Sequence, residues 1–240
     1  MQYSFFFIIG TIFGSFLNVV IYRVPNQISI IKPRSHCPKC KKMIPFYRNI
    51  PIISFLLQKG RCNNCSMQIS LIYPLTEFII GLFFLIGLHY FQYIESFSFI
   101  LVASLLYTIS VIDYKYYIIP LELSFITLIA LLPNIIISTN SLFYIYGLLV
   151  GLGYLLFIYT ITWAITKKEP LGLGDIQLIA LLGLWLGPLK ILITIFLSAC
   201  IGIIYWIMLY FISGYEKNRK LPFGTFLSLS AIIIYLTKLV

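Results

Sequence analysis

Residues 189–212 read LKILITIFLSACIGIIYWIMLYFI, a run with one charged side chain, Lys190. A helix needs about 20 mostly apolar residues to cross the hydrocarbon core of a bilayer, and this run is long enough. Comparable runs recur through the chain, in which 60% of the 240 residues are hydrophobic and 10% are charged. Because the runs lack the alternation of barrel strands, the sequence predicts an all-α polytopic membrane protein.

Applying the same criterion outward from residues 189–212, we predict about eight transmembrane helices. Glu95 marks an expected turn, and residues 114–117 and 138–141 an inner loop and an outer turn. The sixth helix is too short to cross about 30 Å at 1.5 Å per residue, so it lies inside a bundle or meets a locally indented membrane surface. The expected spans are residues 3–22, 74–93, 97–112, 118–137, 142–166, 175–187, 189–212 and 222–240.

Basic residues mark the long loop between the first two predicted spans. The chain has a net charge of +10, and residues 23–73 contain nine Lys or Arg and no Asp or Glu. The positive-inside rule makes this loop cytosolic, and both termini then lie outside, with only Lys190 and Lys238 of the basic residues. The basic residues of this loop are explained by its cytosolic topology and by attraction to anionic lipid headgroups. We expect no nucleic-acid partner, because the loop lacks the interleaved aromatic residues of a single-strand groove.

Four cysteines in this loop have the spacing of a zinc site. Cys37-Pro-Lys-Cys40 and Cys62-Asn-Asn-Cys65 are separated by 21 residues. Two such pairs can supply the four tetrahedral thiolate ligands of a structural Zn²⁺. A cytosolic loop disfavours disulfides, and redox chemistry is the less favoured alternative. We therefore predict a small zinc-binding domain in which His36 is a neighbour of the metal rather than a ligand.

Two aspartates lie at the ends of predicted membrane spans. Asp113 ends the third span, and Asp175 follows Gly172-Leu-Gly174 at the start of the sixth. A carboxylate in hydrocarbon costs about 2.5–3.5 kcal/mol on insertion scales, so each one needs an explanation. Taken singly, Asp175 could be a first-turn helix acid, and Asp113 could pair with Lys115.

Taken together, the two aspartates can form a catalytic pair. The predicted topology puts both at the cytosolic side and at one depth. Two close carboxylates in a low dielectric share a proton, so that one activates water and the other polarises a peptide carbonyl. Gly172 and Gly174 would let an extended peptide backbone approach Asp175. This pattern favours a membrane-embedded aspartyl protease.

Motifs spread over most of the chain identify a family. The chain resembles the type IV prepilin peptidases, also called prepilin leader peptidase/N-methyltransferases, and the motifs stand in that family's order. One departure is Gln177, where family members typically have Lys. The motifs are Gly14-Ser-Phe-Leu-Asn-Val-Val-Ile-Tyr-Arg-Val-Pro25, Ser35-His-Cys-Pro-Lys-Cys40, Asn49-Ile-Pro-Ile-Ile-Ser54, the second cysteine pair, Tyr73-Pro-Leu-Thr-Glu77, the Asp113 region, Gly172-Leu-Gly-Asp-Ile-Gln-Leu178 and Leu221-Pro-Phe-Gly-Thr-Phe226.

The resemblance implies a multi-pass enzyme of the bacterial cytoplasmic membrane. Such enzymes cut the short basic leader from prepilins and pseudopilins at the cytosolic face, and their two catalytic aspartates match Asp113 and Asp175. It also implies three parts: residues 1–22 as a first membrane helix, 23–72 as a zinc-binding and methyltransferase domain, and 73–240 as the peptidase domain. The pilin system served and the oligomeric state stay open.

The resemblance further implies methylation of the new N-terminus with S-adenosylmethionine. The loop has no Gly-rich nucleotide signature, so the residues that bind this cofactor are not marked by a motif. Glu77, Asn18 and Arg23 are candidates. Each also has an ordinary interpretation: a helix-entry acid, a packing amide and an interfacial anchor.

Two other functions compete with this one. Related Gly-x-Gly-Asp proteases, such as archaeal preflagellin peptidases or signal-peptide peptidases, share the aspartates, but the four cysteines argue against them. A non-enzymatic scaffold or transporter could use intramembrane carboxylates for proton movement.

Overall fold

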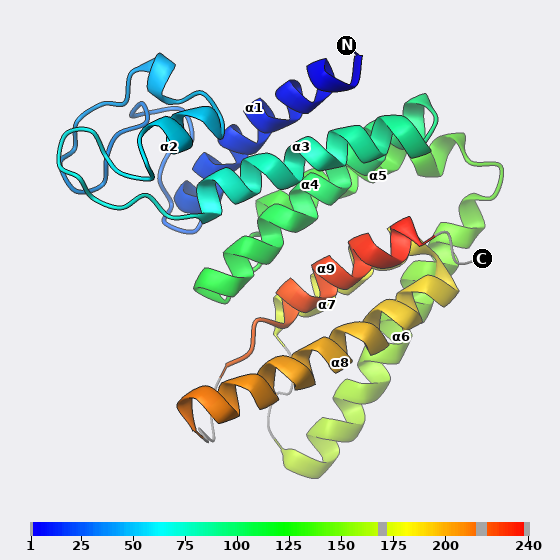
Figure 1. Cartoon of the computed structure of the whole chain (residues 1–240). Helices are drawn as coiled ribbons and strands as arrows, with labels where there is room; N and C mark the ends of the chain where they lie inside the picture. Colours follow the sequence, from blue (N-terminus) through cyan, green and yellow to red (C-terminus); the bar gives the residue numbers. More distant parts are fainter. Residues whose placement is uncertain (1, 168–171, 215–219, 238–240) are drawn as a thin grey trace. The chain divides into compact units, whose positions relative to one another are not determined.

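The computed structural model describes residues 2–167, 172–214 and 220–237, and within these ranges it contains helices, turns and two isolated β-bridges but no strand (Figure 1). The all-α prediction is confirmed. The chain divides into two compact units, Met1–Ile100 and Leu101–Val240, with the boundary inside helix α4 (Tyr93–Tyr116).

In the first unit, α1 (Gln2–Arg23) packs against α3 (Ile72–Tyr90). Glycines bring the two backbones together: a Cβ added at Gly10 would lie 2.8 Å from the Cα of Gly81, and one at Gly14 would lie 2.8 Å from the Cα of Glu77. Small residues allow this close approach between membrane helices. The loop between α1 and α3 contains two short helices, η1 (Phe46–Arg48) and α2 (Ile53–Leu57).

In the second unit, the short helix α7 (Leu173–Leu186) contacts four other helices. Its side chains at Leu178, Ile179 and Leu182 are almost completely buried. The sixth predicted span therefore lies within a bundle of helices, one of the two arrangements that its length allowed. The neighbours of α7 are α5 (Leu121–Ile137), α6 (Ser141–Thr166), α8 (Pro188–Ser213) and α9 (Phe223–Leu236).

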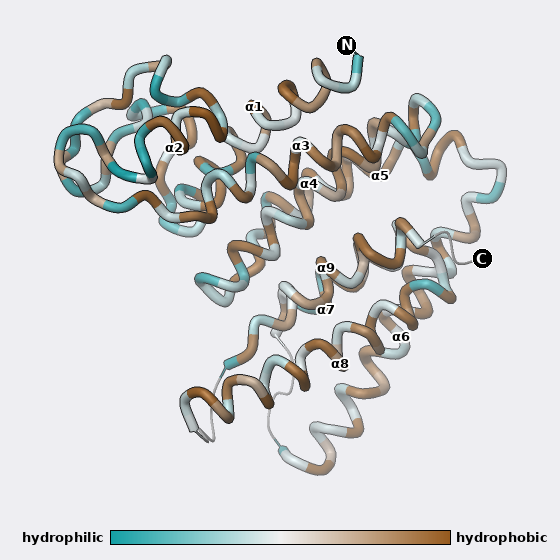
Figure 2. The backbone as a smooth tube through the Cα atoms, in the orientation of Figure 1, coloured by the Kyte–Doolittle hydropathy of each residue, from teal (hydrophilic) through white to brown (hydrophobic). Residues whose placement is uncertain are grey.

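The helices carry the hydrophobic character of a membrane protein. Figure 2 shows hydrophobic colour along the long helices and much more hydrophilic colour in the loop between α1 and α3. Among the described residues, five helices are long and apolar enough to span a bilayer: α1, α3, α4, α6 and α8. The apolar helices α5, α7 and α9 have 17, 14 and 14 residues. Each of the eight predicted spans is thus an apolar helix, while eight complete crossings remain a prediction.

Two predicted breaks between helices are present, but they lie a few residues from the predicted positions. Glu95 was expected in a turn, and residues 114–117 in a loop, but α4 (Tyr93–Tyr116) contains Glu95 and all of that loop except Tyr117. An acid in the first turn stabilises a helix through the macrodipole, so Glu95 starts α4 rather than separating it from α3. The next helix begins at Leu121, not at residue 118, because Pro120 disfavours helical geometry in the residue before it. Part of the connection between the predicted spans 142–166 and 175–187, residues 168–171, lies outside the described residues.

Candidate active site, zinc site and cavity

Asp113 is buried in the last turn of α4 and is held by the N-terminus of α9. Its Oδ2 accepts the backbone N–H of Thr225 at 2.7 Å, and the Thr225 hydroxyl lies 3.1 Å from the same oxygen. The N–H of Gly224 also donates to this carboxylate. Helix N-termini offer unpaired N–H groups to anions, so α9 fixes the position of Asp113. Within the described ranges no ion pair joins Asp113 to the exposed Lys115, and the anchoring alternative has no support.

Asp175 is half-buried in the first turn of α7, in the same unit as Asp113. Its carboxylate accepts the N–H of Gly172, the residue that caps the helix. The first-turn role considered for Asp175 alone is therefore real. It coexists with a second feature, because Asp175 lies close enough to Asp113 for the two charges to interact. The structure thus brings the predicted pair together.

The glycines near the two aspartates serve different purposes. A Cβ at Gly174 would lie 3.1 Å from the Cβ of Ile119, so this glycine makes room for a side chain of the protein itself. A Cβ at Gly224 would lie 2.8 Å from Ile119 Cδ1 and 3.1 Å from Asp113 Oδ2. Gly172 is exposed, and among the described residues only the Asp175 carboxylate, at 3.6 Å, lies near the place of its missing Cβ.

No role for Thr225 or Gly224 is apparent from the sequence alone. The hydrogen bond from Thr225 to Asp113 spans 112 positions of the chain, and no local pattern reveals such a contact. The available signal was the motif Leu221-Pro-Phe-Gly-Thr-Phe226, which contributed only to the resemblance. Gln177, the departure from the family, has a buried Nε2 without a hydrogen-bond partner in the described part of the chain.

The four loop cysteines lie together in the geometry of a tetrahedral metal site. Their sulfur atoms all lie within 4.8 Å of one another, and the Sγ atoms of Cys37 and Cys65 are 3.7 Å apart. Four thiolates at the usual Zn–S distance of about 2.3 Å have sulfurs about 3.8 Å apart, so the residues fit zinc. All four cysteines are free thiols.

Each cysteine pair sits in the same backbone turn, so the loop contains an internal repeat. In both turns the N–H of the first cysteine bonds the carbonyl five residues later, and a left-handed residue follows the second cysteine. The sequence signal is Cys-x-x-Cys followed by Ile four residues on, at Ile44 and Ile69. The bonds are Cys37–Lys42 (3.0 Å), Cys62–Met67 (2.8 Å), Ile44–Ser35 (2.8 Å) and Ile69–Gly60 (2.7 Å), and the left-handed residues are Lys41 (φ 57°) and Ser66 (φ 54°).

The turns prepare two of the four thiols for a cation, while burial and the neighbouring cysteine side chains raise the pKa of Cys65 to about 11. Backbone N–H groups of Asn64 and Cys65 lower the pKa of Cys62 to about 6, and the N–H of Lys42 lowers the pKa of Cys40. Thiolates are the metal-binding form of cysteine, so these turns favour binding of Zn²⁺.

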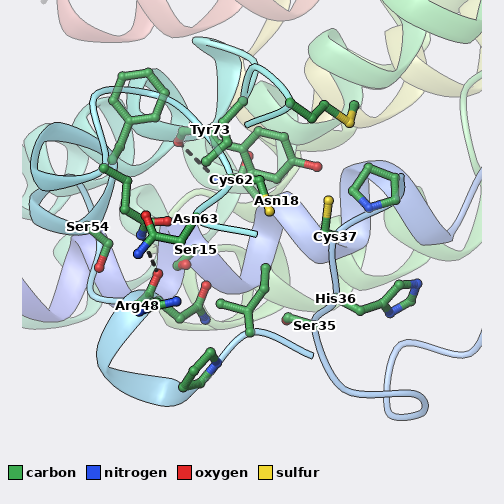
Figure 3. A pocket seen from close by; sticks show the side chains of 18 of the residues that line it. Ser15, Asn18, Ser35, His36, Cys37, Arg48, Ser54, Cys62, Asn63 and Tyr73 are labelled. Atoms are coloured by element: carbon green, nitrogen blue, oxygen red, sulfur yellow. Dashed lines mark hydrogen bonds between the residues drawn. The ribbon is translucent and has the colours of Figure 1, made fainter. Parts of the chain in front are cut away.

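The three cofactor candidates line one cavity in the first unit, bounded by α1, α3 and the cysteine loop. Figure 3 shows Asn18 together with Cys37 and Cys62 of the lining. Each candidate is also tied to backbone. Asn18 donates to the carbonyl of Tyr73 at 3.0 Å, and Glu77 accepts the N–H of Ile52 at 2.7 Å. Arg23 donates to two loop carbonyls, those of Ser29 at 2.7 Å and Pro33 at 2.5 Å, so it folds the loop.

Comparison with known proteins assigns the chain to a family. Residues 8–91 match the family described as Bacterial Peptidase A24 N-terminal domain, and residues 99–207 match the Type IV leader peptidase family. The prepilin leader peptidase/N-methyltransferase of Bacillus subtilis is 35% identical over 234 residues, which cover 97% of this chain and 93% of the relative. The chain belongs to the type IV leader peptidase family.

Other relatives agree with this assignment. The type 4 prepilin-like proteins leader peptide-processing enzyme of Escherichia coli is 34% identical over 96% of this chain and 92% of the relative. The prepilin leader peptidase/N-methyltransferase of Myxococcus xanthus is 33% identical over 90% of this chain, which spans only 65% of that protein. No solved structure matches the chain. The match to the Bacterial Peptidase A24 N-terminal domain contains the four loop cysteines and Glu77. The match to the Type IV leader peptidase family contains both aspartates.

Proposed function

We propose that this chain is a membrane-embedded aspartyl endopeptidase that removes the basic leader of type IV prepilins or pseudopilins. Asp113 and Asp175 are its catalytic pair. The observation that carries this proposal is their arrangement: one carboxylate ends α4, the other begins α7, and the two lie within electrostatic reach in a bundle of apolar helices. Membership of the leader peptidase family supplies the reaction class.

The pair hydrolyses the peptide bond in the manner of aspartic proteases. One carboxylate is ionised and takes a proton from water, which attacks the scissile carbonyl, while the protonated partner donates a hydrogen bond to that carbonyl oxygen. Collapse of the tetrahedral intermediate releases the leader and protonates the new amine of the mature pilin. Asp113 is the fixed member, since α9 holds it, and Asp175 is the accessible one beside Gly172.

The active site and the zinc loop both face the cytosol. The nine basic residues of the loop support this orientation through the positive-inside rule. A prepilin substrate is an apolar helix with a short basic leader, so its cleavage point meets the membrane surface at the depth of the two aspartates. The peptidase domain covers residues 73–240, and residues 23–72 form the zinc-binding domain, after the first membrane helix at 1–22.

The same chain methylates the new N-terminus of the pilin. Its relatives are named prepilin leader peptidase/N-methyltransferase, and this name supports the second activity. S-adenosylmethionine supplies an activated methyl group when it is bound. Zinc on Cys37, Cys40, Cys62 and Cys65 folds the loop.

Replacing either aspartate tests the peptidase proposal. Asp113→Asn and Asp175→Asn should each lower the leader cleavage rate of the purified protein by at least about a hundredfold, since general acid–base catalysis contributes that much or more. The exposed acid Glu122 gives the matched control, Glu122→Gln, which should cleave normally. Mass spectrometry of the pilin N-terminus reports the cut site and a methyl group together. Normal cleavage by either aspartate variant would contradict the mechanism.

A further inference from the structure

The loop between α1 and α3 carries a patch of apolar side chains on its surface. Leu57 of α2 and Phe46 of η1 are each 79% exposed, and large apolar neighbours are exposed beside them. An exposed cluster of such side chains marks contact with another protein or with a membrane. We call this cluster the α2 patch, and it comprises Phe46, Tyr47, Ile50, Ile53, Leu56 and Leu57.

The α2 patch is one surface, because a buried serine of α2 joins η1 to the helix. The hydroxyl of Ser54 accepts the N–H of Ile50 at 3.0 Å and lies 3.4 Å from the carbonyl oxygen of Tyr47, to which it donates. The three patch residues of α2 itself have the i, i+3, i+4 spacing of one helix face. The exposed face of α2 is therefore apolar over its whole length.

The opposite face of α2 points into the first unit. Phe55 and Ser54 line the cavity bounded by α1, α3 and the cysteine loop. The ring of Phe55 lies 3.0 Å from the place that a Cβ on Gly60 would take. The apolar face of α2 is thus turned away from the cavity.

Helix α2 begins beside the start of a membrane-spanning helix. The N–H of Ile52, the residue that precedes α2, donates to the carboxylate of Glu77 at 2.7 Å. Glu77 lies about 7 Å along α3 from Ile72, at 1.5 Å per residue. The polar interface on each side of the hydrocarbon core is about 5–7 Å thick. Since Leu75 and Phe78 on this stretch of α3 are exposed apolar residues that suit lipid, α2 starts at the depth of the headgroups.

The charges around the α2 patch suit an anionic surface. Arg48 lies in η1, Lys59 and Arg61 follow α2 closely, and all three are exposed. Residues 23–73 contain no acid. A basic residue near anionic lipid favours attachment about fivefold, and apolar side chains flanked by basic ones are typical of segments that lie in a membrane interface. A protein partner would have to bring acidic groups of its own, whereas anionic headgroups already lie at this depth.

We propose that the α2 patch inserts into the cytosolic leaflet of the membrane that holds the chain, with Arg48, Lys59 and Arg61 on anionic headgroups. The loop is then held at the ends of α1 and α3 and at the α2 patch. Insertion fixes the wall of the cavity that α2 provides at the membrane surface. The choice of leaflet rests on the cytosolic orientation proposed above, whereas the insertion itself does not.

A photoreactive side chain reports what covers the patch. The full chain, loaded with zinc and carrying p-benzoylphenylalanine at Leu57, is reconstituted with prepilin in vesicles of phosphatidylethanolamine and anionic phosphatidylglycerol and then irradiated. Mass spectrometry should find the α2 peptide joined to lipid acyl chains. The matched control carries the same group at Phe55, on the opposite face of α2, and should give only a background yield of lipid adduct. Unchanged zinc content would show that both variants fold.

Changes of charge test the same contact. With the photoreactive group at Leu56, Leu57→Asp should lower the yield of lipid adduct several-fold, because a carboxylate is repelled by anionic headgroups and is costly in apolar surroundings. Leu57→Met should keep the yield. Vesicles of phosphatidylcholine alone carry no net charge and should lower the yield about fivefold or more.

The other outcomes contradict the proposal. An α2 peptide joined to prepilin, or to a second copy of the chain, would make the patch a protein interface instead. No lipid adduct at Leu57, while the same group at the exposed Leu75 of α3 reacts with lipid, would also overturn insertion. Equal yields in the two kinds of vesicle would remove the role of the basic residues. Leader cleavage is measured on the prepilin in the same vesicles, so a failure of insertion leaves the proposed function standing.

Discussion

The two candidate catalytic carboxylates are held by different helix N-termini. Asp175 reaches back to the capping residue of its own helix, Gly172, while Asp113 is held across the fold by Gly224 and Thr225 of α9. A helix N-terminus carries a partial positive charge, which favours an anion at that point. The positions of the two acids therefore depend on how α7 and α9 begin.

Thr225 should act as a positioning residue for Asp113. Thr225→Val keeps the backbone N–H and the shape of the side chain but removes the hydroxyl, whose proton is shared between Asp113 Oδ2 at 3.1 Å and the carbonyl of Ser110 at 2.9 Å. A hydrogen bond to a charged group contributes about 1.5–3 kcal/mol, so kcat for leader cleavage should fall about ten- to a hundredfold while KM changes little. Steady-state kinetics with a prepilin peptide measures both constants.

Rescue distinguishes this role from a general loss of structure. Thr225→Ser restores the hydroxyl and should recover most of kcat. A Ser variant as slow as the Val variant would mean that the methyl group of Thr225, not its hydroxyl, is what matters.

At the residue scale, the sequence predicts the acids but not what holds them. Asp113 and Asp175 are conspicuous because carboxylates are rare in apolar runs. Thr225 looks like any other hydroxyl in a membrane helix, and its contact depends on the packing of α9. The hydrogen bond from Ile52 to Glu77 is likewise not predictable from the sequence, because it requires the folded loop.

At the element scale, the cysteine loop is built from two equivalent turns that converge on one point. Sequence spacing predicted the ligand set, and the cluster of four sulfurs fits it. The equivalence of the turns was missed because the residues between the cysteines differ, Pro-Lys in one and Asn-Asn in the other. Backbone hydrogen bonds, rather than those side chains, define the turn.

Removal of a single thiol should cost the zinc and the loop fold. The purified chain should contain one zinc ion, and Cys62→Ser should contain much less, because structural zinc sites need all their ligands. Elemental analysis gives the metal content, and limited proteolysis should then cut within residues 24–71. Cys200→Ser removes a cysteine of α8, outside the cluster, and should keep both zinc and protection. Zinc loss in that control would contradict the assignment of ligands.

Helix ends were less predictable than helix identities. Polar residues were taken as breaks, yet α4 includes Glu95 and Lys115 because a first-turn acid and a last-turn base both suit the macrodipole. The depth of α7 in its bundle also could not be read from its length alone. Its burial follows from contacts with α5, α6, α8 and α9.

At the scale of the whole molecule, exposed apolar surface requires a lipid environment. Phe211 is 80% exposed and Phe196 is 72% exposed, both on α8. Such side chains would form a large apolar patch in water. With five helices long enough to span a bilayer in the described ranges, the chain is a multi-pass membrane protein.

The orientation of this membrane protein decides which compartment meets the active site, and fusions can measure it. A green fluorescent protein fused after residue 60 should fluoresce, because the positive-inside rule predicts a cytosolic position for the basic loop of residues 23–73. An alkaline phosphatase fused after residue 139, in the connection between α5 and α6, should be active, because that connection lies outside. Exchanging the two reporters is the control and should silence both. An active phosphatase after residue 60 would put the cysteine loop outside, where a cytosolic methyl donor could not reach it, and would overturn the topology.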